Sequence, residues 1–347
     1  MLGEAIRDYN TLMRFRSFLM FLLLFPPVML QARDIGHERQ IDSFIEHMVS
    51  EDGFDRSELK AIFDQIQRCD TAIRLVSPLP SSRPMDWRSY RSRFVNPIRI
   101  AGGVDYWKTH RRALARASRR FFVPPEIIVA IIGVETGYGR HTGGYRVLDA
   151  LATLAFDYPD APNRKERMDF FRGELENALI FSRRSGIDPL SLHGSYAGAI
   201  GMPQFMPGSI MKYGVDFDGD GKVDLMHSAP DAIASVANFL YSHGWKKGEA
   251  IVFPASVKSD KWQSLSGGLS AKYSLKRLEE AGIFPKVRTP GLSFGLIDLR
   301  NGESPEEYWL GTDNFFAITQ YNRSYYYAMS VVDLSRAVKR AFVEKKH

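Results

Sequence analysis

The stretch that most constrains the fold of this chain runs from Pro124 to Arg140. Pro124 and Pro125 suit the opening turn of a helix, because the first N–H groups of a helix have no intrahelical partner. The positions that follow are apolar on every side, and a helix without a polar face belongs inside a domain. Gly137 predicts the end of this helix, since glycine readily adopts the left-handed conformation of a C-terminal cap. We therefore expect a buried helix at the centre of the fold that stops at Gly137.

The last turn of this helix carries one acidic residue, Glu135. Helical spacing places Ile127, Ile128 and Ile131 on the same face, so the carboxyl group lies among apolar side chains at the negative end of the helix dipole. Both surroundings disfavour the ionised form and raise the pKa of the carboxyl group towards neutrality, as a general acid requires. The alternative interpretation is a structural carboxylate that pairs with an arginine or with backbone N–H groups.

Composition and motif content exclude several classes of function. The 347 residues are 44% hydrophobic and 25% charged, which is ordinary for a globular protein with a sizeable core. The formal charge of +6 favours a negatively charged partner. The basic residues do not alternate with aromatic residues, so we expect no nucleic acid partner. One cysteine cannot build a cysteine-rich zinc site, and the sequence contains no serine-hydrolase elbow, zinc-protease motif or phosphate-binding lysine loop.

Residues 1–32 have the pattern of a secretory signal. Arg14 and Arg16 precede an apolar run from Phe18 to Phe25, and Leu30-Gln31-Ala32 offers a cleavage site. The apolar run is too short for a comfortable membrane span. We therefore expect export of the protein, with an uncleaved anchor or a buried helix as the alternative.

The rest of the sequence predicts a mainly α (α+β) protein with a small β-containing portion late in the chain. Apolar residues recur at helical spacing in the segments 38–49, 55–66, 104–120, 146–156, 165–184, 231–242 and 325–342. Four prolines, with aromatic residues between them, predict an extended segment over 75–100. Short β-type runs lie within 250–253, 294–299 and 307–321. The arginines between positions 111 and 120 predict a solvated basic face, with contact to an anionic polymer or a membrane as the alternative.

The segment 216–227 has the spacing of a calcium-binding loop. Aspartates occupy its first, third, fifth and ninth positions, Gly221 allows the sharp turn at the sixth, and His227 replaces the closing glutamate. The predicted ligands are Asp216, Asp218, Asp220, the backbone carbonyl of Lys222 and, as the substitute for the missing glutamate, Asp231. A Ca²⁺ ion surrounded by protein oxygens has no open position for a substrate, so it would brace the fold. The alternative is an aspartate-rich turn that its own side chains stabilise.

Two further segments have the composition of a ligand-binding surface. The segment 193–207 is rich in glycine and proline, so we expect a loop with at most a short helix, where backbone can approach a ligand closely. Residues 320–327 contain four tyrosines. Tyrosines stack on sugar rings and form hydrogen bonds through their hydroxyl groups, although such a cluster is also typical of a packed core.

Several motifs follow one another in a fixed order along the chain. They are GVETxxGR at 133–140, LDALATL at 148–154 with FDYP at 156–159, GELE at 173–176, GSYAGAIG at 194–201 with QFMP at 204–207, the Asp216 loop, DAIASVAN at 231–238, HGW at 243–245 and YN at 321–322. Over nearly the whole mature chain, this order resembles the membrane-bound lytic transglycosylase B family, glycoside hydrolase family 103.

The resemblance implies a lysozyme-like helical core with additional helical segments and a small β-containing lobe. It also implies cleavage, without water, of the β-1,4 bond between N-acetylmuramic acid and N-acetylglucosamine in peptidoglycan, which leaves 1,6-anhydro ends. Glu135 matches the family's catalytic acid, which then serves as the base. The positions that match the family's saccharide groove are Ser195, Gln204, Arg167, Tyr321, Asn322 and Tyr327. The matched motifs offer one obvious acid, whereas a standard glycosidase needs a pair.

The chain departs from the family pattern in an insertion, in a calcium loop that is about one residue longer before Asp231, and in the absence of a lipid-anchoring cysteine. An insertion over 160–165 lies where relatives carry a pair of arginines, and only Arg167 aligns there. Cys69 is the only cysteine and predicts a small buried thiol. Because no cysteine follows the signal to accept a lipid, we expect a periplasmic protein without a lipid anchor.

The expected catalytic domain spans 33–347. We expect it to comprise a helical part over 33–123, a lysozyme-like core with the calcium loop over 124–247, and a β-containing part over 248–347. Peptidoglycan glycan strands are the expected partner, and the chemistry requires no cofactor. Complexes of cell-wall synthesis or division, and peripheral contact with the membrane, are further partners that the resemblance leaves open. The competing functions are a hydrolytic muramidase and a non-catalytic peptidoglycan-binding scaffold.

Overall fold

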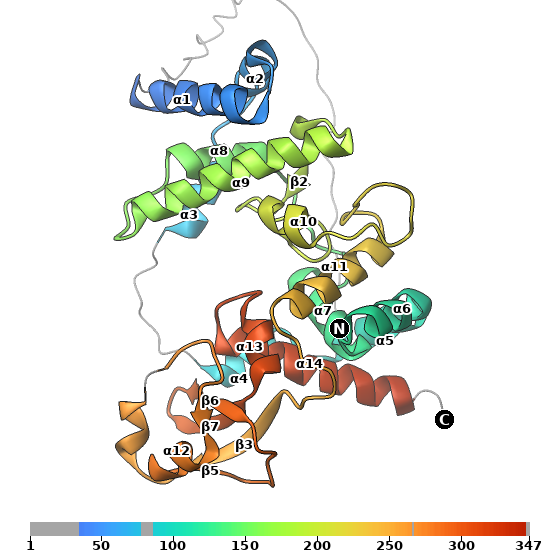
Figure 1. Ribbon diagram of the computed structural model, residues 1–347, viewed down its shortest axis with the longest axis vertical. Coiled ribbons are helices and arrows are strands. Elements are labelled where there is room, and N and C mark those ends of the chain that lie inside the picture. Colours follow the sequence, from blue (N-terminus) through green and yellow to red (C-terminus); the bar gives the residue numbers. More distant parts are fainter. Residues whose placement is uncertain (1–34, 78–85, 266, 345–347) are drawn as a thin grey trace, which may run out of the picture.

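A computed structural model describes residues 35–77, 86–265 and 267–344, and the expected signal segment 1–32 lies outside these ranges. The described chain is mainly helical, with one small antiparallel sheet late in the sequence, which confirms the predicted fold class (Figure 1). The helices before the sheet are α1 (Ile35–Asp52), α2 (Arg56–Phe63), α3 (Asp70–Val76), α4 (Trp87–Ser92), α5 (Pro97–Thr109), α6 (Arg111–Phe121), α7 (Pro125–Thr136), α8 (Val147–Phe156), α9 (Arg164–Ser185), α10 (Pro207–Tyr213) and α11 (Ala229–Ser242).

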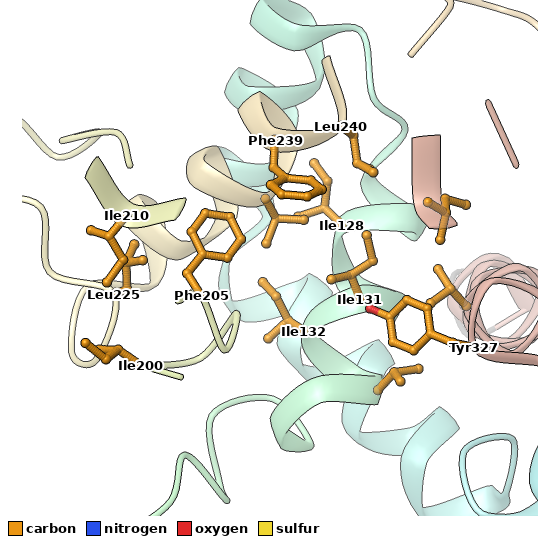
Figure 2. Close-up of a cluster of buried hydrophobic side chains, with 14 of the residues drawn as sticks. Ile128, Ile131, Ile132, Ile200, Phe205, Ile210, Leu225, Phe239, Leu240 and Tyr327 are labelled. Carbon is orange, nitrogen blue, oxygen red and sulfur yellow. The ribbon is translucent and has the colours of Figure 1, made fainter. Parts of the chain in front are cut away.

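The helix α7 lies in the interior, where it contacts α5, α6, α11 and the C-terminal helix α14 (Tyr325–Glu344). Every side chain from Ile127 to Ile132 is almost completely buried. Figure 2 shows Ile128, Ile131 and Ile132 of this helix among the aromatic side chains of neighbouring elements. Gly137 caps the helix with φ of +60°, so the expected buried helix and its end are both confirmed. Each buried isoleucine contributes about 1.5–3 kcal/mol to the stability of the fold.

The β-containing lobe follows α11. Its strands are β3 (Val252–Val257), β4 (Tyr273–Ser274), β5 (Ile283–Pro285), β6 (Ser293–Asn301) and β7 (Ser304–Gly311), which form one antiparallel sheet in the order β4-β6-β7-β3-β5. The helix α12 (Leu275–Glu280) packs beside β4 and β5. A separate small hydrophobic core, which includes Leu278, Ile283 and Phe294, holds this lobe together. From the lobe the chain returns through α13 (Asp313–Thr319) to α14, which packs back into the main core.

The prediction of an extended segment over 75–100 is wrong for the residues of this range that the structure describes. The helices α4 and α5 lie there, and their N-caps are Asp86 and Asn96, whose side chains accept hydrogen bonds from backbone N–H groups of the first turn. Pro97 stands in the first turn of α5, where a proline is tolerated because its missing N–H group is not needed. Trp87 is buried in an edge-to-face contact with Tyr326 of α14, which fixes α4 against the core.

Three other expectations need correction. The β-type run at 307–321 is a strand only to Gly311, because Thr312 caps α13 and turns the chain into a helix. The helix expected over 104–120 divides at His110 into α5 and α6. Cys69 is half-buried rather than buried, and it stands at the N-terminus of α3, where its N–H group donates to Thr153 Oγ1. The basic face of α6 is exposed, as expected.

Candidate active site

Three segments that are distant in sequence meet at the end of α7. They are the last turn of α7 with Glu135, the loop that joins the short strand β2 (His193–Gly194) to α10, and the first turn of α14. Tyr327 of α14 donates a hydrogen bond from its Oη to Glu135 Oε1 at 2.6 Å. Tyr321 lies nearly parallel to Tyr327, with 6.3 Å between the ring centroids. Its hydroxyl group donates to the backbone oxygen of Pro203 at 2.7 Å and so joins the loop to the tyrosines.

The environment of Glu135 brings the pKa of its carboxyl group close to neutral pH. Burial raises the pKa of Glu135 to about 7, and the hydrogen bond from Tyr327 opposes this rise because it stabilises the carboxylate. Burial, together with the nearby carboxylate, holds the pKa values of Tyr321 and Tyr327 well above their ordinary range. Both phenols therefore stay protonated at neutral pH and serve as hydrogen-bond donors. In the described part of the chain Glu135 has no arginine partner, which removes the structural ion pair considered from the sequence.

The end of α7 is fixed by contacts that the sequence did not reveal. Thr136 donates from its Oγ1 to the backbone oxygen of Met202 at 2.8 Å, and the same hydroxyl accepts from the N–H of Gly139. Arg99 of α5 donates to the backbone oxygen of Gly133, one turn before the cap. Tyr138 donates to the backbone oxygen of Arg99 at 2.7 Å. These contacts hold the helix end, and with it Glu135, relative to the loop.

Tyr138 packs against glycines of two helices. A Cβ atom on Gly103 or Gly133 would lie within 2.7 Å of the Tyr138 hydroxyl oxygen. The glycines are therefore required because the tyrosine ring approaches the helix backbone closely. A glycine pair in α5 and a glycine inside the apolar helix were the available sequence signals, but neither indicates which side chain fills the space.

Ser195 and Gln204 both lie in the loop after β2 and shape its backbone. Ser195 Oγ accepts hydrogen bonds from the N–H groups of Ala197 and Ala199. Gln204 has φ of +51° and donates from Nε2 to the backbone oxygens of Thr142 and Gly201 at 3.0 and 2.9 Å. The loop therefore packs on the segment that follows α7.

The remaining groove residues are placed differently. Asn322 follows Tyr321 directly and is exposed. Arg167 is exposed in the first turn of α9, and no contact among the described residues joins it to Glu135 or to the tyrosines. The structure thus brings Tyr321 and Tyr327 to the acid, places Ser195 and Gln204 in the adjoining loop, and leaves Arg167 apart.

The predicted calcium loop closes on the N-terminus of α11. Carboxylate oxygens of Asp216, Asp218 and Asp231 lie within 4.8 Å of one another. Asp231 is buried, and its two oxygens accept from the N–H groups of Phe217, Asp218 and Asp224, which fold the loop around it. Burial and the adjacent Asp218 carboxylate raise the pKa of Asp231. A divalent cation would offset both effects, so the residues present fit such an ion.

The other predicted ligands contribute differently. Asp220 is exposed and accepts the N–H of Lys222, and neither residue belongs to the group of three converging carboxylates. His227 stands at the closing position but bonds to Asp224, with 3.0 Å between Nδ1 and Oδ2. Arg116 of α6 packs on the loop, because its guanidinium lies 3.7 Å from the centroid of the buried Phe217 ring.

The fold and the site define a class of protein. A buried helix ends in one glutamic acid with a pKa near neutrality, tyrosines and a glycine-rich loop surround the acid, and the fold is mainly helical. This arrangement is that of an acid–base enzyme of the lysozyme-like type.

The comparisons with known proteins identify the family. The family described as "Transglycosylase SLT domain" matches residues 36–336. The membrane-bound lytic murein transglycosylase B of Escherichia coli strain K12 is 41% identical over 328 residues, which cover 91% of this chain and 87% of the relative. The chain therefore belongs to the transglycosylase SLT domain family, and it is a lytic transglycosylase.

Solved structures agree with this assignment. The soluble lytic transglycosylase SltB1 of Pseudomonas aeruginosa is 42% identical, with a TM-score of 0.80 over 87% of this chain and 99% of that one. The Escherichia coli lytic transglycosylase Slt35 in complex with calcium is 43% identical, with a TM-score of 0.78 over 87% and 93% of the two chains. SltB3 of Pseudomonas aeruginosa in complex with NAG-NAM-pentapeptide is 28% identical, with a TM-score of 0.74 over 88% and 80%. Among the described residues, no helix combines the length and apolar character needed to cross a membrane.

Proposed function

We propose that Glu135 is the only acid–base catalyst in a lytic cleavage of the N-acetylmuramic acid to N-acetylglucosamine bond of peptidoglycan, which yields 1,6-anhydro ends. The observation that carries this proposal is the environment of the carboxyl group. Burial raises the pKa of Glu135, the Tyr327 hydrogen bond opposes this rise, and no neighbouring carboxylate of the described chain contributes to the shift. A hydrolytic glycosidase of the standard type places a second carboxylate across the scissile bond. One acid without a partner suits a reaction in which the sugar's own hydroxyl group replaces water.

The two oxygens of the Glu135 carboxyl group have different roles in this proposal. Tyr327 donates to Oε1, so Oε2 is the oxygen that delivers the proton to the glycosidic oxygen. The resulting carboxylate is stabilised by the phenol of Tyr327, which remains protonated. As the C6 hydroxyl group of the muramyl residue attacks C1, Glu135 takes up the proton of that hydroxyl group. The new C6–O–C1 bond replaces the broken glycosidic bond, and the acid returns to its starting state.

The residues around Glu135 would orient the sugars. The positions of Tyr321, Ser195 and Gln204 support a role in lining the saccharide groove, because the loop and the tyrosine ring meet beside the acid. Asn322 is exposed next to Tyr321 and would face a sugar directly. We also propose a glycan or peptide contact for Arg167, which would lie farther along the strand than the residues beside Glu135.

We further propose that the loop binds a structural Ca²⁺ ion through Asp216, Asp218 and Asp231. The outer ligands would be Asp220 and the carbonyl of Lys222. Support comes from the three converging carboxylates and from the calcium complex of the similar Slt35. The ion would fix the loop against the N-terminus of α11 and would take no part in the chemistry.

The proposed site of action is the periplasm, where peptidoglycan lies. Support comes from the similar membrane-bound transglycosylase of Escherichia coli.

We propose the division into 33–123, 124–247 and 248–347 as a description of the catalytic domain. We also propose, from the family resemblance, partners in cell-wall synthesis or division and a peripheral contact of the basic α6 face with the membrane.

Product analysis tests the proposed reaction. The wild-type protein is incubated with purified sacculi, and mass spectrometry identifies the released ends. Anhydro ends are expected, and reducing ends would identify a hydrolytic muramidase instead.

Glu135→Gln should lower turnover by about 10² to 10⁴-fold while sugar binding is retained. The control is Glu126→Gln at the opposite end of α7, where the carboxylate pairs with Lys339 at the surface. Full activity of Glu135→Gln would contradict the proposal, and a wild-type protein that releases no ends of either kind would favour a binding scaffold.

A further inference from the structure

The first glutamate of the GELE motif makes a contact that the catalytic proposal does not use. Glu174 is a half-buried residue of α9, and its Oε2 accepts a hydrogen bond from the backbone N–H of Gly208 at 2.7 Å. Burial raises the pKa of Glu174, and the hydrogen bond from Gly208 opposes this rise. Gly208 is the second residue of α10. The contact therefore joins the start of α10 to the middle of α9.

The start of α10 has no cap of its own. Its N-cap residue, Met206, forms no capping hydrogen bond through its side chain, and its first residue, Pro207, has no N–H group. The N–H of Gly208 is therefore the first donor of this helix that lacks an intrahelical acceptor. In most helices a Ser, Thr, Asp or Asn side chain at the N-cap position accepts such a hydrogen bond. Here Glu174 accepts it from a neighbouring helix, and a carboxylate also suits the positive end of the helix dipole.

The two helices approach each other closely at this point. A Cβ atom at Gly208 would lie 3.1 Å from Glu174 Oε1 and 3.1 Å from Asn177 Nδ2. Beside the contact lies a cavity of about 600 Å³ between α9, α10 and α11, and Glu174 and Gly208 both line it. Side chains do not fill this space, so packing alone does not fix the start of α10. The hydrogen bond is the polar contact that does.

The chain that leads into α10 is the loop beside the catalytic acid. The backbone oxygens of Met202 and Pro203 accept hydrogen bonds from hydroxyl groups of the catalytic site, at 2.8 and 2.7 Å. Gln204 follows them, and Gly208 comes four residues after Gln204. One end of this segment is therefore attached to the catalytic site, and the other end is attached to α9 through Glu174.

We propose that Glu174 is a positioning residue, whose carboxylate caps α10 from α9 and so fixes the end of the loop that carries Gln204. The proposal rests on the proposed function, because it takes this loop as a wall of the saccharide groove. Without the cap the end of the loop can move, whereas Glu135 keeps its hydrogen bond from Tyr327. The loss of Glu174 should therefore weaken sugar binding and leave proton transfer nearly unchanged.

The test measures KM and kcat for anhydro-product formation from purified glycan strands, at a temperature at which circular dichroism shows that each variant is folded. Glu174→Ala should raise KM by roughly tenfold and change kcat by less than about twofold, because a hydrogen bond to a charged group is lost. Glu174→Gln keeps an acceptor oxygen without the charge, so its KM should lie between those of the wild type and Glu174→Ala. A residue that only stabilised the fold would leave both constants unchanged in the folded protein.

The matched control is Glu176→Ala, at the second glutamate of the same motif. The side chain of Glu176 lies against His47 of α1, with 3.6 Å between Oε2 and Nε2, so its loss should not affect α10. Gly208→Ala changes the contact from the other side, since the added Cβ atom displaces the carboxylate, and it should raise KM as well. The proposal is overturned if Glu174→Ala has the KM of Glu176→Ala, or if it loses kcat while KM stays the same.

Binding to Glu135→Gln separates this proposal from the catalytic one. In that background the strands are not cleaved, and Glu174→Ala should weaken their binding by roughly tenfold whether or not Glu135 is the catalyst. Failure of the catalytic proposal appears instead in the wild type, as the absence of anhydro ends. If Glu174→Ala does not fold, Glu174→Gln decides the test, and a KM equal to that of the wild type then overturns the proposal.

Discussion

The Tyr327 hydroxyl group lies 2.6 Å from Glu135 Oε1, across a sequence separation of 192 residues. This contact joins the C-terminal helix to the last turn of the central helix. Burial favours the protonated form of the carboxyl group, and the phenol favours the carboxylate. The balance between the two determines the pKa of Glu135, and a catalyst that acts first as an acid and then as a base needs a pKa near the working pH.

Replacing Tyr327 with phenylalanine should move the pH dependence of the reaction towards higher pH. In the wild type, kcat/KM should fall as the pH rises through about 7, because Glu135 then loses the proton that it must donate. Loss of the hydrogen bond removes the contribution that lowers the pKa, so the alkaline limb should move upward by about one unit. A pH profile of anhydro-product formation measures the shift. Tyr241→Phe, at an exposed position of α11, serves as the control and should leave the limb in place. An unchanged or downward limb for Tyr327→Phe would contradict the assignment.

Glu135→Gln should stabilise the protein above neutral pH. The pKa of Glu135 is raised from 4.5 to about 7 in the folded state, so its contribution to stability is fully present below pH 4.5 and is lost as the pH rises through about 7. Glutamine does not ionise and escapes this loss, which is about 3 kcal/mol at pH 8. Thermal unfolding of both proteins at pH 5 and pH 8 measures the effect. The variant should melt at a higher temperature at pH 8, and the difference should shrink at pH 5. Equal melting temperatures at pH 8 would show that the carboxylate is not destabilised by burial.

The parts of the site that the sequence predicted are those with a local signal. The end of α7 is specified by its own prolines, its run of isoleucines and Gly137, so the position of Glu135 on a buried face was predictable. The contact with Tyr327 has no such signal, since it depends on how α14 packs after the whole lobe has intervened. The prediction of an extended segment over 75–100 was wrong for a local reason. Composition does not distinguish a proline that begins a helix from one that interrupts it.

In the calcium loop, one part of the ligand arrangement was predictable from the sequence and another part was not. The spacing of the aspartates predicted the loop, and Asp231 was identified as the nearest replacement for the missing glutamate. The structure places Asp231 with Asp216 and Asp218, whereas Asp220 is exposed and does not belong to this group. Sequence spacing does not decide which aspartates converge, because the closing residue comes from α11 and acts through three backbone N–H groups.

Removal of Ca²⁺ should therefore lower the melting temperature of the protein. At a free Ca²⁺ concentration one hundred times the Kd, binding stabilises the folded state by about 2.7 kcal/mol. Thermal unfolding with and without a chelator measures this difference. Asp231→Asn should abolish the response to Ca²⁺, while Asp220→Asn, which lies outside the converging group, should retain most of it. If chelation changes neither the melting temperature nor the bound metal content of the wild type, the loop is an aspartate-rich turn stabilised by its own hydrogen bonds.

Gly133→Ala should lower both stability and activity. A Cβ atom at Gly133 would lie 2.7 Å from the Tyr138 hydroxyl oxygen and 2.8 Å from the ring, so the tyrosine must move. Tyr138 holds the backbone of Arg99, which in turn holds the last turn of α7, so the displacement reaches Glu135. Overpacking of this kind costs about 1–3 kcal/mol. The matched control is Gly173→Ala in α9, where a Cβ atom meets no atom within 4 Å. That change should stabilise the protein by about 0.5–1 kcal/mol, because alanine favours a helix more than glycine does. Urea unfolding and anhydro-product formation measure the two variants, and a Gly133→Ala protein as stable and active as Gly173→Ala would show that Tyr138 does not position the catalytic helix.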